Sequence, residues 1–111
     1  MMSLIYKFLI LIQVSITTTM AEENKAPEGL WDSFAEIYAK EHEKDQLDGS
    51  MQLLTAVNAS RSTFHIDVGC GSGVSCLALS KLAQPGATIV GLDNSEKMIE
   101  GALKRFQRSG F

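Results

Sequence analysis

The segment HIDVGCGSG at residues 65–73 restricts the fold of this chain more than any other feature. A short apolar run contains an acid, Asp67, and three glycines follow at alternate positions, Gly69, Gly71 and Gly73. Because glycine has no Cβ, this stretch predicts a tight turn whose backbone N–H groups lie open to a ligand. The helix expected after the turn would direct the positive end of its dipole at an anionic group of that ligand.

A second acid stands at the end of the next apolar run. Residues 87–92 read ATIVGL and lead into Asp93, which follows Gly73 by twenty residues. A carboxylate at the tip of a strand, beside a glycine turn, can accept hydrogen bonds from two ribose hydroxyls. Together the two segments predict a pocket for an adenosine-bearing cofactor.

The apolar pattern predicts four helices and two strands. Helices are expected over 29–44, after a turn at 48–50, from Val74 to a stop at 84–86, and after a cap at 94–95. Strands are expected at 63–68 and 87–92, and their apolar character is typical of a sheet with helices on both faces. The positions expected to face the core are Leu30, Trp31, Phe34, Ile37, Tyr38, Met51, Leu54, Val57, Val74, Leu77, Ala78, Leu82, Met98, Ile99, Ala102, Leu103 and Phe106. This order of elements predicts an α/β fold with parallel strands.

Length and charge narrow the possibilities further. The 111 residues make about one small domain, yet only two strands are predicted where sheets usually have about four to six. The chain therefore has the pattern of the first half of a domain. A net charge of −3 gives no reason to expect nucleic acid or an acidic membrane surface as a partner. The basic cluster Lys104, Arg105 and Arg108 is expected to complement the dipole of the last helix.

Residues 1–20 form a hydrophobic N-terminal segment with two interpretations. Lys7, an apolar stretch and a small-residue tail resemble a weak secretory signal peptide, which would place the protein in the secretory pathway. Alternatively, MAEENKAPEG from Met20 is typical of the start of a cytosolic protein, and the preceding residues are a spurious extension. We favour the second interpretation and a cytoplasmic location. The segment is too short and interrupted for a stable membrane span. Without it, the expected fold comprises N-terminal helices at 21–62 and the first half of a cofactor-binding domain at 63–111.

Cys70 and Cys76 lack the spacing of metal ligands, and no metal site is predicted. Both are expected to pack as small apolar residues beside the cofactor, with their side chains too far apart for a disulfide.

Residues 63–106 resemble the class I S-adenosylmethionine-dependent methyltransferases, particularly the small-molecule group, most specifically in DVGCGSG and GLDNSEKMI. The resemblance implies a Rossmann-like methyltransferase fold, here partial, with the first two parallel strands and their flanking helices. It also implies methyl transfer from S-adenosyl-L-methionine to a small-molecule acceptor. WDSFAEIYAKEH at 31–42 is similar to the family's N-terminal helix, which often lies over the cofactor pocket. Nothing in the chain matches the family's later motifs, so no catalytic residue is assigned.

The resemblance also implies a set of cofactor-binding residues. These are Asp67, Gly69, Cys70, Gly71, Gly73, Asp93, Asn94 and Met98. The glycines would shape the loop beside the methionine portion of the cofactor, and Asp67 would orient its ammonium group. Asp93 would hold the ribose hydroxyls, and Asn94 would lie beside the adenine edge.

Two other functions stay open. The chain could be a donor-binding remnant that transfers nothing, or part of an NAD(P)-binding oxidoreductase. The dinucleotide fingerprint needs Gly-x-Gly-x-x-Gly, but Val74 or Cys76 stands at the third glycine position. Asp67, directly before the turn, would also repel a pyrophosphate. The oligomeric state is left open.

Overall fold

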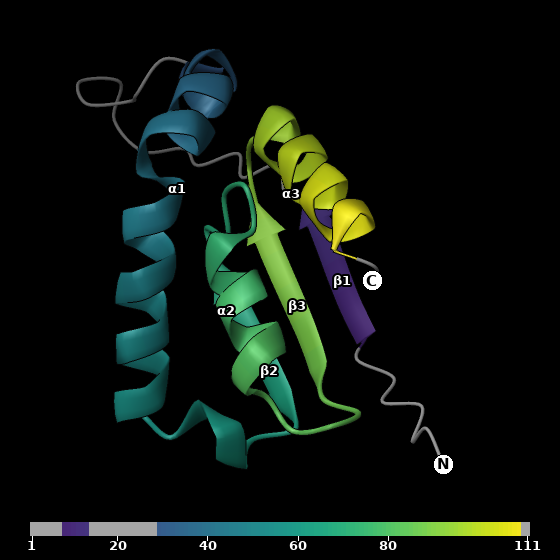
Figure 1. Cartoon of the computed structure of the whole chain (residues 1–111). Helices are drawn as coiled ribbons and strands as arrows, with labels where there is room; N and C mark the ends of the chain where they lie inside the picture. The colour runs from purple at the N-terminus through teal and green to yellow at the C-terminus, as the bar shows by residue number, and fades with distance from the viewer. Residues whose placement is uncertain (1–7, 14–28, 110–111) are drawn as a thin grey trace, which may run out of the picture.

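A parallel three-stranded sheet forms the centre of the structure, a computed structural model that describes residues 8–13 and 29–109. Its strands β1 (Phe8–Gln13), β2 (Phe64–Val68) and β3 (Thr88–Asp93) lie in the order β1-β3-β2 (Figure 1). The helices are α1 (Leu30–Ala56), α2 (Val74–Leu82) and α3 (Glu96–Arg108), and the short 3₁₀ helix η2 (Ala59–Arg61) precedes β2. The predicted α/β fold is confirmed as a partial Rossmann-like arrangement.

The two predicted strands pair directly with each other. β2 runs parallel to β3, from Phe64 opposite Thr88 to Val68 opposite Leu92. Because the two strands are parallel, with α2 connecting them, their carboxyl ends lie at the same end of the sheet. The glycine segment follows β2 at this end, and Asp93 ends β3 there.

The third strand comes from the N-terminal segment that the sequence analysis left out of the fold. β1 runs parallel to β3, from Phe8 opposite Thr88 to Gln13 opposite Asp93. The exclusion was therefore wrong for residues 8–13, because a short apolar run is as typical of a strand in a parallel sheet as of a signal peptide. The interpretation of residues 1–20 as a signal or an extension stays a prediction.

Helix α1 is one continuous helix rather than the two predicted. It runs through Asp48, Gly49 and Ser50, where a turn was expected. A glycine inside a helix costs only about 0.5–1 kcal/mol relative to alanine, so Gly49 does not by itself interrupt the helix. Instead of capping a second helix, the Ser50 hydroxyl lies 3.2 Å from the Ser75 hydroxyl of α2. Packing against α2 thus replaces the predicted turn.

The core lies between the sheet and the helices. Several predicted core residues are buried there: Val74, Ala78, Met98, Ile99, Ala102 and Phe106. Others are wrong, since Trp31 and Phe34 are each 48% exposed, and Ile37, Val57 and Leu103 are also exposed. Helix α1, described over its full length, has no buried residue, because its apolar pattern meets too few partners along the helix.

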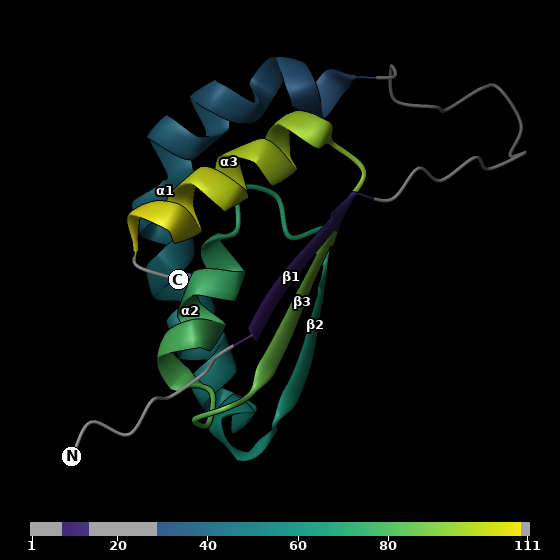
Figure 2. The same ribbon diagram turned by 90° about the vertical axis from the view of Figure 1, so that its right-hand side faces the viewer.

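All three helices lie on one face of the sheet, as the side view in Figure 2 shows. Within the described residues no helix covers the other face, contrary to the expectation from the apolar strands. On β2, Phe64, Ile66 and Val68 alternate with His65 and Asp67, and they are 59%, 57% and 80% exposed. Asp67 therefore points toward the helices, which is the side on which the glycine segment turns.

Candidate cofactor site

The glycine loop, residues 69–73, joins β2 to α2 in the tight turn that was predicted. The backbone N–H groups of Gly69 and Cys70 both donate to the carbonyl of Leu92 on β3, at 2.7 and 2.9 Å. Gly69, Gly71 and Gly73 have φ values of 73°, 53° and 84°. These lie in the left-handed region, which glycine enters without steric cost. The loop is thus bonded to the end of β3 at its start and opens α2 at Gly73.

Asp93 lies directly against this loop. Its Oδ2 accepts a hydrogen bond of 2.7 Å from the N–H of Gly71, and its Oδ1 accepts one of 2.8 Å from the N–H of Ser95. One carboxylate therefore connects the glycine loop to the start of α3. Because each carboxylate oxygen has two lone pairs, both oxygens keep the capacity to accept a second bond.

Asp67 places a second carboxylate on the helix side of β2. It is half-buried, and its Oδ2 accepts a hydrogen bond of 3.4 Å from the thiol of Cys76. Burial raises the pKa of Asp67, and the negative charge of Asp93 raises it further, while the thiol bond opposes both effects. The negative charges of Asp67 and Asp93 repel each other, so this end of the sheet favours a cationic group.

The two cysteines are free, buried and in contact with each other. The thiol of Cys70, burial and the Asp67 carboxylate all raise the pKa of Cys76. Both cysteines are free, so the prediction of no disulfide between them stands, although the two thiols interact. Side chains in a helix point back toward its N-terminus, and Cys76 in the first turn of α2 is thereby directed at the glycine loop. The Cys76 thiol remains protonated and acts as a donor to Asp67.

A hollow of about 350 Å³ lies between α1 and the glycine loop. Of the predicted site residues, Gly69, Cys70 and Gly71 line it. Residues from α1 that sequence reasoning did not assign also line it: Tyr38, Gln46, Gly49, Ser50 and Leu53. The amide of Gln46 donates a hydrogen bond to the Tyr38 hydroxyl across this wall. The similarity of segment 31–42 to a helix that lies over a cofactor pocket was a signal for Tyr38 alone, because the other four residues follow that segment.

The remaining predicted residues lie around the loop rather than in that hollow. Met98 is buried at the start of α3, and its sulfur lies 3.9 Å from the position of a Cβ built on Gly71. Met98 also lines a wider hollow of about 970 Å³ between α1 and α3. Gly73 packs against α3, and Asn94 is exposed directly after β3. The structure therefore gathers the predicted residues at one end of the sheet, but on different sides of the loop.

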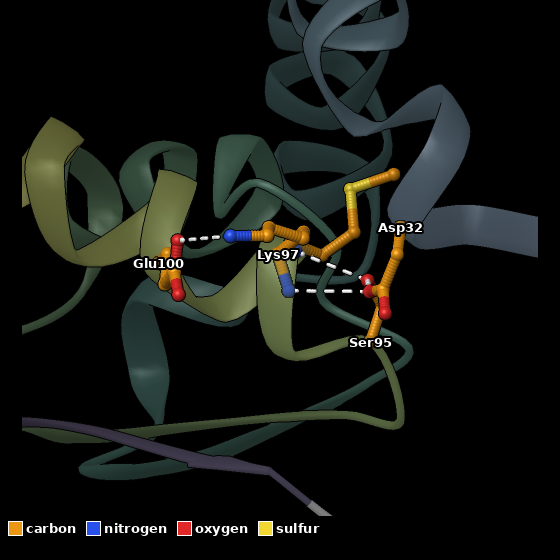
Figure 3. A network of polar contacts seen from close by, with 5 residues as sticks. Asp32, Ser95, Lys97 and Glu100 are labelled. Carbon is orange, nitrogen blue, oxygen red and sulfur yellow. Dashed lines mark hydrogen bonds and ion pairs between the residues drawn. The ribbon is translucent and has the colours of Figure 1, made fainter. Parts of the chain in front are cut away.

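Helix α1 is also bonded to the start of α3, close to Asp93. Figure 3 shows the Asp32 carboxylate accepting hydrogen bonds from the Ser95 hydroxyl and from the N–H of Lys97, the latter at 3.2 Å. The Ser95 hydroxyl in turn accepts a bond of 3.1 Å from the N–H of Met98, which confirms the predicted cap. These bonds hold the Asp32 carboxylate ionised, with its pKa below the ordinary value. Sequence reasoning missed Asp32 because its partners are more than sixty residues away.

Within residues 8–13 and 29–109, no group of three or more His, Cys, Asp or Glu side chains is arranged to hold a metal ion. No helix in the same ranges is both long and apolar enough to cross a membrane. The cytoplasmic location stays a prediction.

Comparison with known proteins assigns the part of the chain that contains the loop. Over 56 residues the chain is 48% identical to an uncharacterized phycocyanin operon protein W of Pseudanabaena tenuis. Over 53 residues it is 34% identical to an uncharacterized 37.1 kDa protein in a transposon of Streptomyces fradiae. The aligned parts are 50% and 48% of this chain, and they span 52% and 15% of those two proteins. No solved structure matches the chain. Residues 60–111 match the model of a methyltransferase domain family, which confirms the resemblance that the glycine loop carries.

Proposed function

We propose that this chain binds S-adenosylmethionine and that its domain transfers the methyl group to a small-molecule acceptor. The observation that carries the proposal is that two carboxylates, Asp67 and Asp93, lie at the end of the sheet where the glycine loop is. S-adenosylmethionine offers a sulfonium, an ammonium group and a ribose diol. The first two are cations, and the diol provides two donors, so the acidic groups fit this ligand.

The open side of the loop also fits a ligand. A Cβ built on Gly69 meets no atom within 4 Å, so the space beside this backbone is free. Asp93 already accepts one bond at each oxygen, and the remaining lone pairs would receive the ribose hydroxyls. Asp67 would attract the ammonium group, and that cation would offset the cost of burying its negative charge.

The bound donor supplies a methyl group made electrophilic by its sulfonium. The chain's own residues then bind the donor, orient it toward the acceptor and shield both from water. Neutral polar groups from α1, namely the Tyr38 hydroxyl, the Gln46 amide and the Ser50 hydroxyl, line the hollow beside the loop. Its volume of about 350 Å³ is in the range of small-molecule sites, which supports a small acceptor. Alignment of acceptor and methyl group in such a site would lower the barrier through proximity.

The same two carboxylates weigh against a dinucleotide. Pyrophosphate binding at a helix N-terminus depends on donors and positive potential, whereas here Asp93 occupies the N–H of Gly71. A pyrophosphate would have to displace that carboxylate and then lie beside Asp67.

Calorimetric titration of the full 111-residue chain with S-adenosylmethionine, S-adenosylhomocysteine and NAD tests the proposal. We expect the first two to bind and NAD to bind far more weakly, if at all. Asp93→Asn should weaken binding of the donor by about tenfold or more, because two charge-assisted bonds lose their charge. Asp48→Asn, an exposed acid on α1, is the matched control and should bind like the wild type. Circular dichroism verifies that Asp93→Asn, which also alters the bond to Gly71, remains folded.

Preference for NAD would overturn the proposal in favour of the oxidoreductase alternative. Donor binding without transfer of a labelled methyl group to any compound in a small-molecule extract would favour the binding remnant.

A further inference from the structure

Arg105 of α3 connects three separate parts of the fold. Its Nε donates a hydrogen bond of 2.8 Å to the backbone carbonyl of Ser72 in the glycine loop. Its Nη1 forms an ion pair with the Glu43 carboxylate of α1. The side chain of Arg105 is only 12% exposed, whereas the Glu43 side chain at the other end of the ion pair is 44% exposed. Arg105 lies in the last turn of α3, where it was expected to complement the helix dipole, and its guanidinium also bonds to the loop.

The face of α3 that carries Arg105 also supports the back of the glycine loop. A Cβ built on Gly73 would lie 3.0 Å from Ala102 Cβ and 3.0 Å from a ring carbon of Phe106. The loop therefore rests directly on α3, with almost no space between them. Arg105 lies between these two contacts in the sequence and adds a polar bond to the apolar packing.

These contacts fix the peptide group between Ser72 and Gly73. Its carbonyl is bonded to Arg105, and its N–H donates to the Cys70 carbonyl at 3.0 Å. The peptide group between Cys70 and Gly71 is also held, because the N–H of Gly71 donates to Asp93. With both groups held, the backbone path of the loop is set before a ligand arrives. Only a planar guanidinium can reach the carbonyl and the Glu43 carboxylate with two donors of fixed geometry.

We propose that Arg105 is a positioning residue for the donor site: it holds the Ser72 carbonyl and, through Glu43, attaches α1 to the glycine loop. The hollow between α1 and the loop then keeps its shape because both of its walls are bonded to one side chain. The guanidinium beside Glu43 also keeps the pKa of that carboxyl below its ordinary value, as expected of a formed ion pair. The role in donor binding rests on the proposed function, whereas the control of loop geometry does not.

The test compares Arg105→Gln, Arg105→Lys and the control Lys104→Gln, an exposed basic residue on the same helix. Three measurements are made on the full chain: affinity for S-adenosylmethionine, amide hydrogen exchange of the loop without donor, and unfolding in urea. We expect Arg105→Gln to lower affinity by about tenfold, the size of one lost bond to a charged group. Arg105→Lys keeps the charge but not the fork, so it should recover part of the affinity. Both should speed exchange at Gly71 and Gly73, and Lys104→Gln should change neither property.

Several outcomes would overturn the inference. Wild-type affinity and loop exchange in both Arg105 variants would do so, and so would a fall in unfolding stability with unchanged loop exchange. If Arg105→Gln does not fold, Glu43→Gln tests whether the ion pair between Glu43 and Arg105 attaches α1 to the loop. We expect it to weaken binding by about threefold, and unchanged binding refutes the attachment. If the wild type itself binds no donor, the proposed function fails, but loop exchange in Arg105→Lys still decides whether Arg105 controls the loop.

Discussion

Substitution of Gly73 by alanine should destabilise the fold more than the same change elsewhere in the glycine loop. Gly73 has φ of 84°, in the left-handed region, where an L-residue costs about 1–2 kcal/mol. Its Cβ would also lie 3.0 Å from both Ala102 and Phe106, closer than side chains normally pack. Forced repacking of this kind typically costs about 1–3 kcal/mol. The two effects together lower the free energy of unfolding by about 2–5 kcal/mol, before a gain of about 0.4–1 kcal/mol from a less flexible unfolded chain is counted.

Gly69→Ala is the matched control for the steric part. Gly69 has a similar φ of 73°, but a Cβ there meets nothing within 4 Å. Backbone strain of about 1–2 kcal/mol therefore applies to both variants, as does the gain of about 0.4–1 kcal/mol from a less flexible unfolded chain. The difference between the variants isolates the contact with α3, about 1–3 kcal/mol.

Urea unfolding followed by circular dichroism measures this difference, and thermal unfolding gives a second reading of about 4–8 °C per kcal/mol. Equal stability of the two variants would refute the close packing of Gly73 on α3. The order of the two variants in affinity for S-adenosylmethionine should differ from their order in stability. Gly69→Ala places a methyl group in the open space beside the loop, so it should bind the donor poorly although it is the more stable protein.

Three further predictions concern single contacts. Because the folded-state pKa of Glu43 lies below its ordinary 4.5, its ion pair stabilises the fold above that pH, and this stability is lost as the pH falls through the lowered pKa. In Glu43→Gln, the free energy of unfolding measured in urea should therefore fall less steeply at acidic pH. Cys76→Ala removes the thiol bond that opposes the raised pKa of Asp67, so carbon NMR should show that pKa rising further; an unchanged titration would mean that the bond is absent in solution. Deletion of residues 1–13 removes β1 and leaves one edge of β3 unpaired, so amide exchange along β3 should accelerate, and unaltered exchange would contradict the pairing.

Local patterns predicted the parts of the site that depend on neighbouring residues. Alternate glycines predicted the turn before α2, and a cap was predicted at 94–95, where the Ser95 hydroxyl bonds to the N–H of Met98. Both features follow from dihedral preferences and from hydrogen bonds within one turn of the chain. For the same reason β2, β3, α2 and α3 lie close to their predicted residues.

What could not be predicted are the contacts between residues that are far apart in the chain. The pair Arg105 and Glu43 spans 62 residues, and Ser95 and Asp32 span 63. An acid on a helix surface has the same local pattern whether or not it bonds to another element, so nothing in the sequence separates Glu43 and Asp32 from the other acids of α1. Similarly, an apolar run such as Phe8–Gln13 reveals its strand only through its partner β3.

Asp93 shows why the residues of the motif were easier to predict than their arrangement. Before any ligand is considered, its two oxygens already accept bonds from Gly71 and Ser95, which join the loop to α3. The carboxylate is therefore part of the scaffold as well as a candidate ligand for ribose. A variant that removes it, such as Asp93→Ala, would lose both roles together, whereas Asp93→Asn keeps one acceptor for the backbone. Comparison of these two variants separates the structural role of Asp93 from its role in donor binding, because Asp93→Ala should lose both stability and donor affinity, whereas Asp93→Asn should lose mainly donor affinity.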